Sequence, residues 1–212
     1  MFRMADKDRR ADVAPLESRT VADVETLRAM ADPTRIAILS ALMESKEDLP
    51  VMSVKELAAR LGEPQTKLYR HVKQLEAAGL IRVAATRIVS GILEQRYQAS
   101  QRDLTFGSEF LREHADDAEA AMSAMLDSFR AGFFRAFRDK SLAPGTVPEE
   151  ERYRKPTIFA AATRVSPATA AQISDKLREI MTWLEGQDIE EPDGVLVDVL
   201  IGYYTPAQAS QD

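Results

Sequence analysis

The sequence contains no cysteine, and this absence excludes several kinds of site at once. Without thiols the chain forms no disulfide and offers no thiolate to a soft metal ion. No apolar run approaches the roughly 20 residues that a membrane-spanning helix needs, and no secretory signal is recognisable. We therefore expect a cytoplasmic protein without a membrane partner.

Catalytic and metal-binding patterns are equally scarce. The two histidines are far apart, and there is neither a glycine-rich phosphate loop nor a pair of carboxylates at a catalytic spacing. His114 is close to Asp116 and Asp117, but one helix cannot aim all three side chains at one ion, so a solvated acidic face is the better interpretation. We expect no enzyme, no metal and no cofactor.

Composition sets the scale of the fold. With 45% apolar residues, the 212-residue chain can build one or two domains with real cores. Residues 1–19 are crowded with charge and show little periodicity, which predicts a mobile tail. Pattern shifts along the rest of the chain predict segments over 20–103, 104–140, 141–156 and 157–212.

The middle of the sequence has the pattern of a helix-turn-helix. Ser53 and Glu56 form a predicted capping box at the start of one helix, and Gly62 supplies the left-handed conformation that ends it. Pro64 restarts a helix at its first turn, and Gly79 ends that second helix. The buried positions of the second helix are Leu68, Val72, Leu75 and Ala78.

The other face of the second helix carries side chains that can read base edges. Arg, Lys, Gln and Thr form hydrogen bonds in the major groove, where the first half of a recognition helix reaches deepest. We assign this face to double-stranded DNA, with Lys73 further along and closer to a phosphate. The candidates on this helix are Gln65, Thr66, Lys67, Tyr69, Arg70 and Lys73.

A two-stranded wing is predicted after the second helix. Residues 80–89 and 93–99 are rich in β-formers and are joined by a short loop around Ser90 and Gly91. Residues 51–102 carry a net charge of +5, whereas the whole chain carries −6, so positive charge gathers where a phosphate backbone would lie. The arginines of the hairpin are therefore further candidates for DNA contact, namely Arg82, Arg87 and Arg96.

Alternatives remain open for this region. Winged helices also dock onto proteins, so a protein-interaction module without operator binding is the competing class. His71 falls on or beside the buried face, between Leu68 and Leu75, which favours a structural histidine over a DNA contact or a ligand.

Residues 30–39 (MADPTRIAIL) resemble the opening segment of arsenic-repressor (ArsR) type winged-helix regulators. Residues 68–72 (LYRHV) and 78–81 (AGLI) resemble the same family, particularly its longer members with an extra C-terminal domain. The resemblance covers roughly residues 20–100 and implies a homodimer that binds a palindromic operator, usually as a repressor, and releases it when an effector or a metal binds. The chain departs from many relatives at Pro64, where they have Ser, and in lacking the cysteine pairs of the metal sensors.

Two further helices are predicted ahead of the helix-turn-helix. Asp32 as N-cap and Pro33 at the first helical position start one of them, and residues 21–31 have the apolar spacing of an earlier one. Arg35 either braces its helix by pairing locally or reaches a phosphate. We favour the brace because Arg35 lies away from the recognition helix.

Residues 107–140 have the periodicity of one long helix. Its apolar stripe is buried against its own domain or a second subunit, and a dimer would place two recognition helices about one turn of DNA apart. We favour dimerisation, with a wall for a hydrophobic ligand as the alternative. The stripe is Phe110, Ala118, Met122, Met125, Phe129, Phe133 and Phe137.

The C-terminal part predicts a strand, a helix and a strand. Residues 157–165 and 194–204 are the strands, and the helix starts at Ser166 and Pro167. The strands pair through a right-handed crossover or antiparallel, and their open edges leave room for the other subunit. A small hydrophobic effector between this unit and the long helix is a further partner that the pattern allows. The aromatic residues available to it are Phe133, Phe134, Phe137, Phe159, Trp183, Tyr203 and Tyr204.

The sequence thus predicts a mainly α protein with a small β content. It combines a winged helix-turn-helix DNA-binding domain, a long dimerisation helix and a small α+β C-terminal unit. The expected function is a sequence-specific, homodimeric transcriptional regulator that acts as a repressor.

Overall fold

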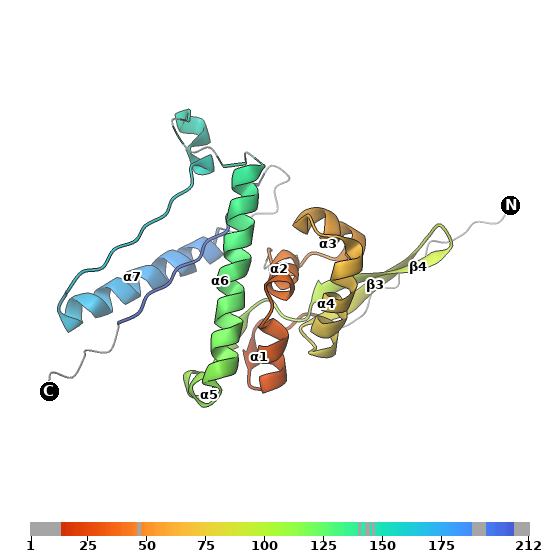
Figure 1. Cartoon of the computed structure of the whole chain (residues 1–212), viewed down its shortest axis with the longest axis horizontal. Helices are drawn as coiled ribbons and strands as arrows, with labels where there is room; N and C mark the ends of the chain where they lie inside the picture. The colour runs from red at the N-terminus through yellow and green to blue at the C-terminus, as the bar shows by residue number, and fades with distance from the viewer. Residues whose placement is uncertain are drawn as a thin grey trace. The chain divides into compact units, whose positions relative to one another are not determined.

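The chain divides into two units, Met1–Gly132 and Phe133–Asp212. Unit 1 contains a helix-turn-helix followed by a long β-hairpin, which extends away from the helices (Figure 1). This arrangement is a mainly α winged helix, as predicted. The computed structural model describes residues 14–45, 48–139, 141–142, 145, 147–187 and 194–205.

Unit 1 joins helices to two small sheets. Strands β2, β4 and β3 form an antiparallel sheet in that order, while β1 pairs with β5 in parallel. The helices are α1 (Val24–Met30), α2 (Pro33–Leu42), α3 (Val54–Leu61), α4 (Gln65–Ala77), α5 (Ser108–Glu113) and α6 (Ala115–Arg138), the last of which runs on into unit 2. The strands are β1 (Arg19–Val21), β2 (Met52–Ser53), β3 (Ile81–Val89), β4 (Ile92–Ala99) and β5 (Leu104–Phe106).

Local side-chain caps start the helices at the predicted residues. The Asp32 carboxylate accepts a hydrogen bond from the Arg35 backbone N–H at 3.0 Å, and Pro33 is the first residue of α2. Ser53 Oγ accepts from the Glu56 N–H at 3.3 Å while Glu56 Oε2 accepts from the Ser53 N–H at 2.7 Å. Each cap satisfies a backbone donor that the helix itself leaves free, which is worth about 1 kcal/mol. Gly62, with φ 65°, ends α3.

The recognition helix α4 starts one residue later than predicted. Pro64 is its N-cap, with extended backbone (ψ 138°), and not its first helical residue. Because proline has no polar side chain, only its carbonyl holds the start of the helix, by accepting from the N–H groups of Lys67 at 3.1 Å and Leu68 at 3.3 Å. The helix ends at Ala77, ahead of Gly79 at φ 66°.

One hydrophobic core holds the helix-turn-helix together. Its fully buried side chains come from α1, α2, α3, α4 and β3, and the face of α4 opposite the exposed polar one packs against α2, α3 and β3. Burying each such side chain contributes about 1.5–3 kcal/mol, which makes α4 a rigid part of unit 1. The largest of them are Leu27, Ile38, Leu42, Leu49, Leu57, Leu68, Leu75, Leu80 and Ile81.

The N-terminal tail is shorter than predicted. Leu16 forms an isolated bridge with Gln101, and β1 pairs with β5, so residues 14–19 belong to the folded unit. The Arg19 guanidinium donates to the carbonyl of Gly79 at 2.9 Å, just after α4. The prediction of a mobile tail was therefore wrong for residues 14–19, since charge content alone does not reveal that these residues have partners elsewhere in the fold. Residues 1–13 of the predicted tail lie outside the described residues. Val21 likewise lies in β1, and α1 starts only at Val24.

The predicted long helix is broken at His114. This residue has φ −119° and ψ 46°, which separates α5 from α6. The His114 N–H donates to the Phe110 carbonyl at 3.1 Å, and its own carbonyl accepts from the Ala118 N–H at 2.9 Å, so it closes one helix and opens the next. Apolar periodicity did not reveal the break because the stripe continues in similar spacing on both sides.

Unit 2 contains the 3₁₀ helix η1 (Glu149–Arg154) and the helix α7 (Pro167–Glu185), which Ser166 caps by accepting from the Thr169 N–H at 3.1 Å. The prediction of strands over 157–165 and 194–204 was wrong. Neither segment forms a strand or pairs with another strand among the described residues. A strand requires a neighbour for its N–H and C=O groups. No described residue of unit 2 is buried.

None of the described helices has the length and apolarity needed to cross a membrane.

Candidate nucleic-acid interface

One face of α4 is polar and open to solvent. All of the candidates that the sequence identified on this helix are exposed, and Tyr69 keeps 54% of its surface accessible. The opposite face is fully covered by the core. The exposed side chains are Gln65, Thr66, Lys67, Tyr69, Arg70 and Lys73, and the buried ones are Leu68, His71, Val72 and Leu75.

Arg35 ties α4 to the helices behind it. Its guanidinium donates to the Gln74 side chain at 3.0 Å, to the Arg28 carbonyl at 2.8 Å and to the Ala29 carbonyl. Only 12% of its side-chain surface is accessible. Arg35 is thus a brace, as the sequence favoured, but it does not lie away from the recognition helix: the same guanidinium joins the end of α1 to α4.

His71 is a structural residue on the buried face of α4, as predicted. It is 3% exposed, and its Nδ1 atom lies 3.4 Å from Asp32 Oδ1. Burial lowers the pKa of His71, and the nearby Asp32 carboxylate opposes this effect only in part. The imidazole therefore favours its neutral form where it packs behind the exposed face.

The cations on α4 are held weakly or not at all by other side chains. Lys67 pairs with Glu63 at 2.9 Å and Lys73 with Glu76 at 2.7 Å, and the hydrogen bond to Glu76 raises the pKa of Lys73. Exposed pairs of this kind contribute at most about 1 kcal/mol, so a phosphate can replace the carboxylate. Arg70 makes no side-chain hydrogen bond or ion pair within the described part of the chain.

The wing arginines have partners of their own. Arg82 donates to the Gln98 side chain at 2.8 Å, and Arg87 donates to Glu94 at 2.5 Å across the hairpin. These two side chains lie along the stalk of the hairpin, at positions that leave them partly exposed.

Arg96 lies beside the start of α3. Its guanidinium donates to the Val51 carbonyl at 2.5 Å and lies 3.2 Å from Glu56 Oε2. Burial tends to raise the pKa of Glu56, but the hydrogen bonds from Ser53 and the charge of Arg96 outweigh it, so the net pKa is lowered. The Arg96 side chain, 24% exposed, therefore completes the capping box.

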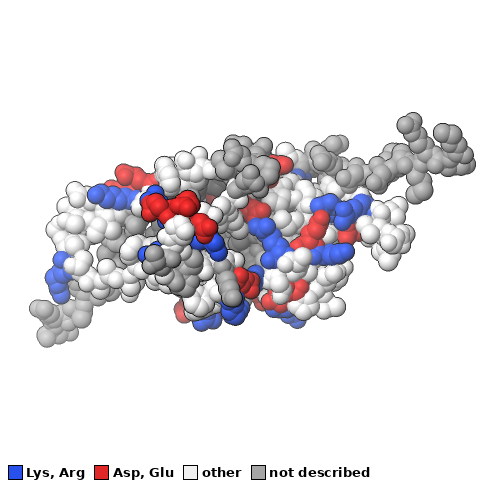
Figure 2. Space-filling model, turned by 90° about the horizontal axis from the view of Figure 1, so that it is seen from above, with Lys and Arg blue, Asp and Glu red and all other residues white. Residues whose placement is uncertain are grey.

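The sequence predicted the turn of the hairpin but not the exposed aliphatic residues beside it. Ser90 and Gly91 form its turn with φ 51° and φ 80°, which is the left-handed pair that a two-residue hairpin turn requires. On either side of this turn the chain exposes aliphatic residues, defined here as the aliphatic tip: Ile88, Val89, Ile92 and Leu93. In Figure 2, coloured charged side chains lie over the hairpin and white atoms lie toward its outer end. The run of apolar letters around Ser-Gly was the available signal.

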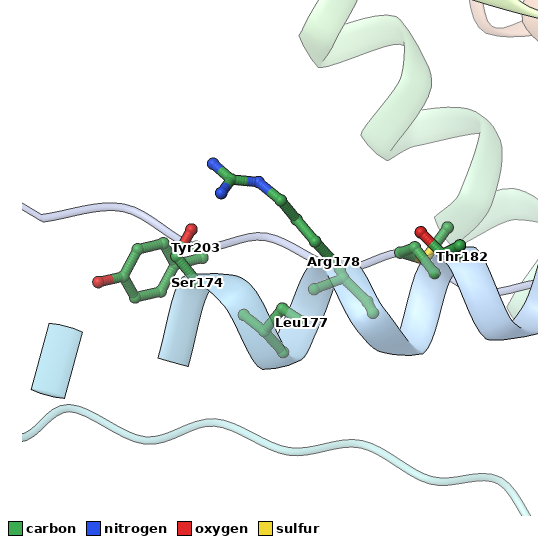
Figure 3. A pocket seen from close by; sticks show the side chains of 7 residues that line it. Ser174, Leu177, Arg178, Thr182 and Tyr203 are labelled. Atoms are coloured by element: carbon green, nitrogen blue, oxygen red, sulfur yellow. The ribbon is translucent and has the colours of Figure 1, made fainter. Parts of the chain in front are cut away.

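Unit 2 contains a separate open cleft of about 530 Å³ (Figure 3). Arg178 and the hydroxyls of Ser174 and Thr182 lie beside apolar side chains from α7 and from the segment after residue 194. Tyr203 belongs both to this lining and to the aromatic set expected around an effector. The lining is Ser174, Leu177, Arg178, Met181, Thr182, Ile201 and Tyr203.

Comparison with known proteins identifies a helix-turn-helix in the same part of the chain. Residues 30–84 match a family described as helix-turn-helix domain. The chain is also similar to the HTH-type transcriptional regulator KmtR of Mycobacterium tuberculosis (strain ATCC 25618 / H37Rv), with 33% identity over 92 residues. The matched region makes up 43% of this chain and 65% of KmtR, so the chain spans a little less than two thirds of that relative. The family match contains all of α2, α3 and α4.

Proposed function

We propose that this protein is a sequence-specific, DNA-binding transcriptional regulator of the ArsR type, because residues 30–84 match a helix-turn-helix family and the chain is similar to the transcriptional regulator KmtR. The observation that carries the proposal is the exposed face of α4, which presents Gln65, Thr66 and Arg70 on a helix anchored by its other face. These residue types form the hydrogen bonds that distinguish base pairs in the major groove. A DNA partner also agrees with the cytoplasmic location expected from the sequence.

The proposed oligomer is a homodimer formed through α6. Ala121 and Ala124 on this helix are buried in the core of unit 1, whereas Met122 is 52%, Met125 37% and Leu126 50% exposed. An apolar stripe at helical spacing on the outer face supports pairing with a second copy. Two copies related by a two-fold axis would read a palindromic operator, and repression follows if that operator overlaps a promoter.

The cleft on α7 supports regulation by a small amphipathic anion. Leu177, Met181 and Ile201 offer an apolar wall, and the Arg178 guanidinium offers a partner for a carboxylate. Among the described residues, Arg178 is engaged only by Asp175 at 3.3 Å, and both side chains of this pair are mostly exposed. An apolar carboxylic acid is therefore the class of effector proposed for this site.

Selection from a random-sequence duplex pool tests DNA binding directly. We expect the purified protein to enrich a palindromic motif, and we expect Arg70→Ala to weaken binding to that motif by about 1–3 kcal/mol, the cost of a lost base contact. Arg112→Ala is the matched control, because Arg112 is an exposed arginine on α5, away from α4. Fluorescence anisotropy with labelled duplex measures both.

The competing class, a protein-docking module, gives the opposite result. Binding to DNA should weaken as salt rises with a log–log slope of about −0.9 per phosphate neutralised. If no motif is enriched and affinity for any duplex is absent at low salt, the proposal is wrong. If a motif is enriched but Arg70→Ala and Arg112→Ala behave alike, the assignment of the α4 face is wrong.

The dimer has its own test. Sedimentation velocity of the wild-type protein should show a dimer at micromolar concentration, whereas Leu126→Lys, which places a charge in the exposed stripe of α6, should sediment as a monomer. Circular dichroism confirms that the variant keeps its helices, as expected for a half-exposed position. A monomeric wild-type protein would contradict the homodimer.

A further inference from the structure

The hairpin ends in an uncharged, apolar tip, although its strands carry arginines. Ile88 is 64%, Ile92 73% and Leu93 63% exposed, and Val89 is 43% exposed. No residue from 88 to 93 carries a charge. Such a cluster is costly to keep in water, since apolar surface gains free energy when it is covered.

The tip is held in a defined shape. Ile88 pairs with Leu93 and Val89 with Ile92 in the ladder of β3 and β4, directly before the two-residue turn. Because alternate residues of a strand point to opposite faces, aliphatic side chains cover both faces of the tip. The Arg87–Glu94 ion pair lies next in the ladder and separates this tip from the stalk.

The tip also belongs to the same rigid unit as the proposed recognition helix. The Lys73 ammonium on α4 lies 3.3 Å from the Gln95 side chain on β4 and 5.7 Å from the centre of the Tyr97 ring. A duplex seated on α4 therefore lies beside the hairpin as well. Residues 51–102, which include α4 and the whole hairpin, carry a net charge of +5, so the surroundings of the tip are complementary to a polyanion.

An aliphatic tip does not suit the phosphates themselves, which remain strongly hydrated. The apolar surfaces that DNA offers are the sugar edges and the base stack, which are reached through the minor groove. We infer that the aliphatic tip enters the minor groove beside the α4 site and wedges against a base step, so that it partly unstacks and bends the duplex. This inference rests on the proposed function and names how the wing takes part in it.

The test uses the duplex selected by the full-length protein. One set of duplexes carries 2-aminopurine at steps flanking the α4 contacts, which reports unstacking by its fluorescence, and another carries a donor and acceptor at its ends, which reports bending by energy transfer. With wild-type protein we expect a rise in 2-aminopurine fluorescence at one step per half-site and an increase in energy transfer.

The variant is Ile92→Ser with Leu93→Ser, and the control is Ile180→Ser with Val195→Ser. The control positions are also exposed aliphatic residues, at 51% and 57%, but lie in unit 2. We expect the tip variant to lose both signals and to bind roughly tenfold more weakly, since the apolar contact of two side chains is lost. The control should keep both signals and wild-type affinity.

The outcomes separate this inference from the proposed function. If the wild-type protein binds the motif in an Arg70-dependent way without bending or unstacking it, the wedge is wrong and the proposed function stands. If it binds no duplex, both are wrong. If the tip variant instead loses self-association in sedimentation without DNA, the tip is a contact between copies and the wedge is overturned.

Discussion

The Nδ1 atom of His71 lies 3.4 Å from Oδ1 of Asp32, the residue that caps α2. This contact joins the start of a scaffold helix to the buried face of the recognition helix. The charges of Arg35, Arg70 and Lys67 add to burial in disfavouring its protonated form. The buried face of α4 therefore contains an imidazole whose neutral form is favoured.

This arrangement predicts a loss of stability in mild acid. Because the pKa of His71 is lowered in the folded protein, the unfolded chain, with a histidine pKa of about 6.5, binds more protons below that pH. The contribution of His71 is therefore fully present above about pH 6.5 and declines as the pH falls below it. Urea unfolding at a series of pH values measures the decline, and His71→Asn should flatten it.

A second variant makes the same prediction sharper. Asp32→Asn keeps a side-chain oxygen for the α2 cap but removes the negative charge that partly supports protonation of His71. The decline in mild acid should then be steeper than in the wild type. Parallel pH profiles for the wild type and His71→Asn would show that this histidine does not govern the acid response.

Arg35→Met should destabilise unit 1 without altering contacts to DNA. The substitution keeps an apolar stem but removes the donors to Arg28, Ala29 and Gln74, which costs on the order of 2–3 kcal/mol for a charged donor at a mostly buried position. The salt slope of DNA binding should stay unchanged because Arg35 contacts no phosphate in this arrangement. Thermal unfolding measures the first effect. If Arg35→Met instead reduced the salt slope of DNA binding and kept wild-type stability, Arg35 would contact a phosphate.

Sequence reasoning worked best where neighbours along the chain decide the structure. Ser53 and Glu56 lie within one helical turn of each other, and Gly62 meets a purely backbone requirement, so residue types at fixed spacing were enough. The turn at Ser90 and Gly91 follows the same logic. The exposed face of α4 was also legible, because helical spacing sorts its side chains into two faces.

Contacts between residues far apart in the sequence were not predicted. The mobile-tail prediction for residues 14–19 failed because Arg19 meets the Gly79 carbonyl, 60 positions away in the chain. Two β-rich segments of unit 2 were expected to be strands, yet β propensity is realised only where another strand supplies hydrogen-bond partners. The contacts of Arg96 with Glu56 and Val51, both more than 35 positions away, were likewise not predicted, and its assignment to DNA stays a prediction.

The nine basic and polar candidates should accordingly separate by experiment. Arg96→Met should lower the free energy of unfolding, by about 1–3 kcal/mol, because it removes the donor to Val51 and leaves Glu56 without its cation. Lys73→Ala should instead leave stability within about 0.5 kcal/mol and reduce the salt slope by about 1, with equal weakening on all sequences. Chemical unfolding and salt-dependent anisotropy on both variants test this. Equal salt slopes for Lys73→Ala and the wild type would exclude a phosphate contact at Lys73.

The cleft on α7 predicts a ligand response that depends on Arg178. A medium-chain carboxylate such as octanoate should raise the melting temperature of the protein, because a ligand that binds only the folded state stabilises it by RT ln(1 + [L]/Kd). Arg178→Gln should abolish this rise, whereas Arg164→Gln, at an exposed arginine outside the cleft lining, should keep it. Octanol, which has a similar chain but no charge, should have a much smaller effect, since the guanidinium supplies a charge-assisted hydrogen bond only to the acid. If both variants show equal shifts, or if the acid and the alcohol do, the alkyl chain of the ligand binds to apolar protein surface in general. Arg178 then does not select an anion.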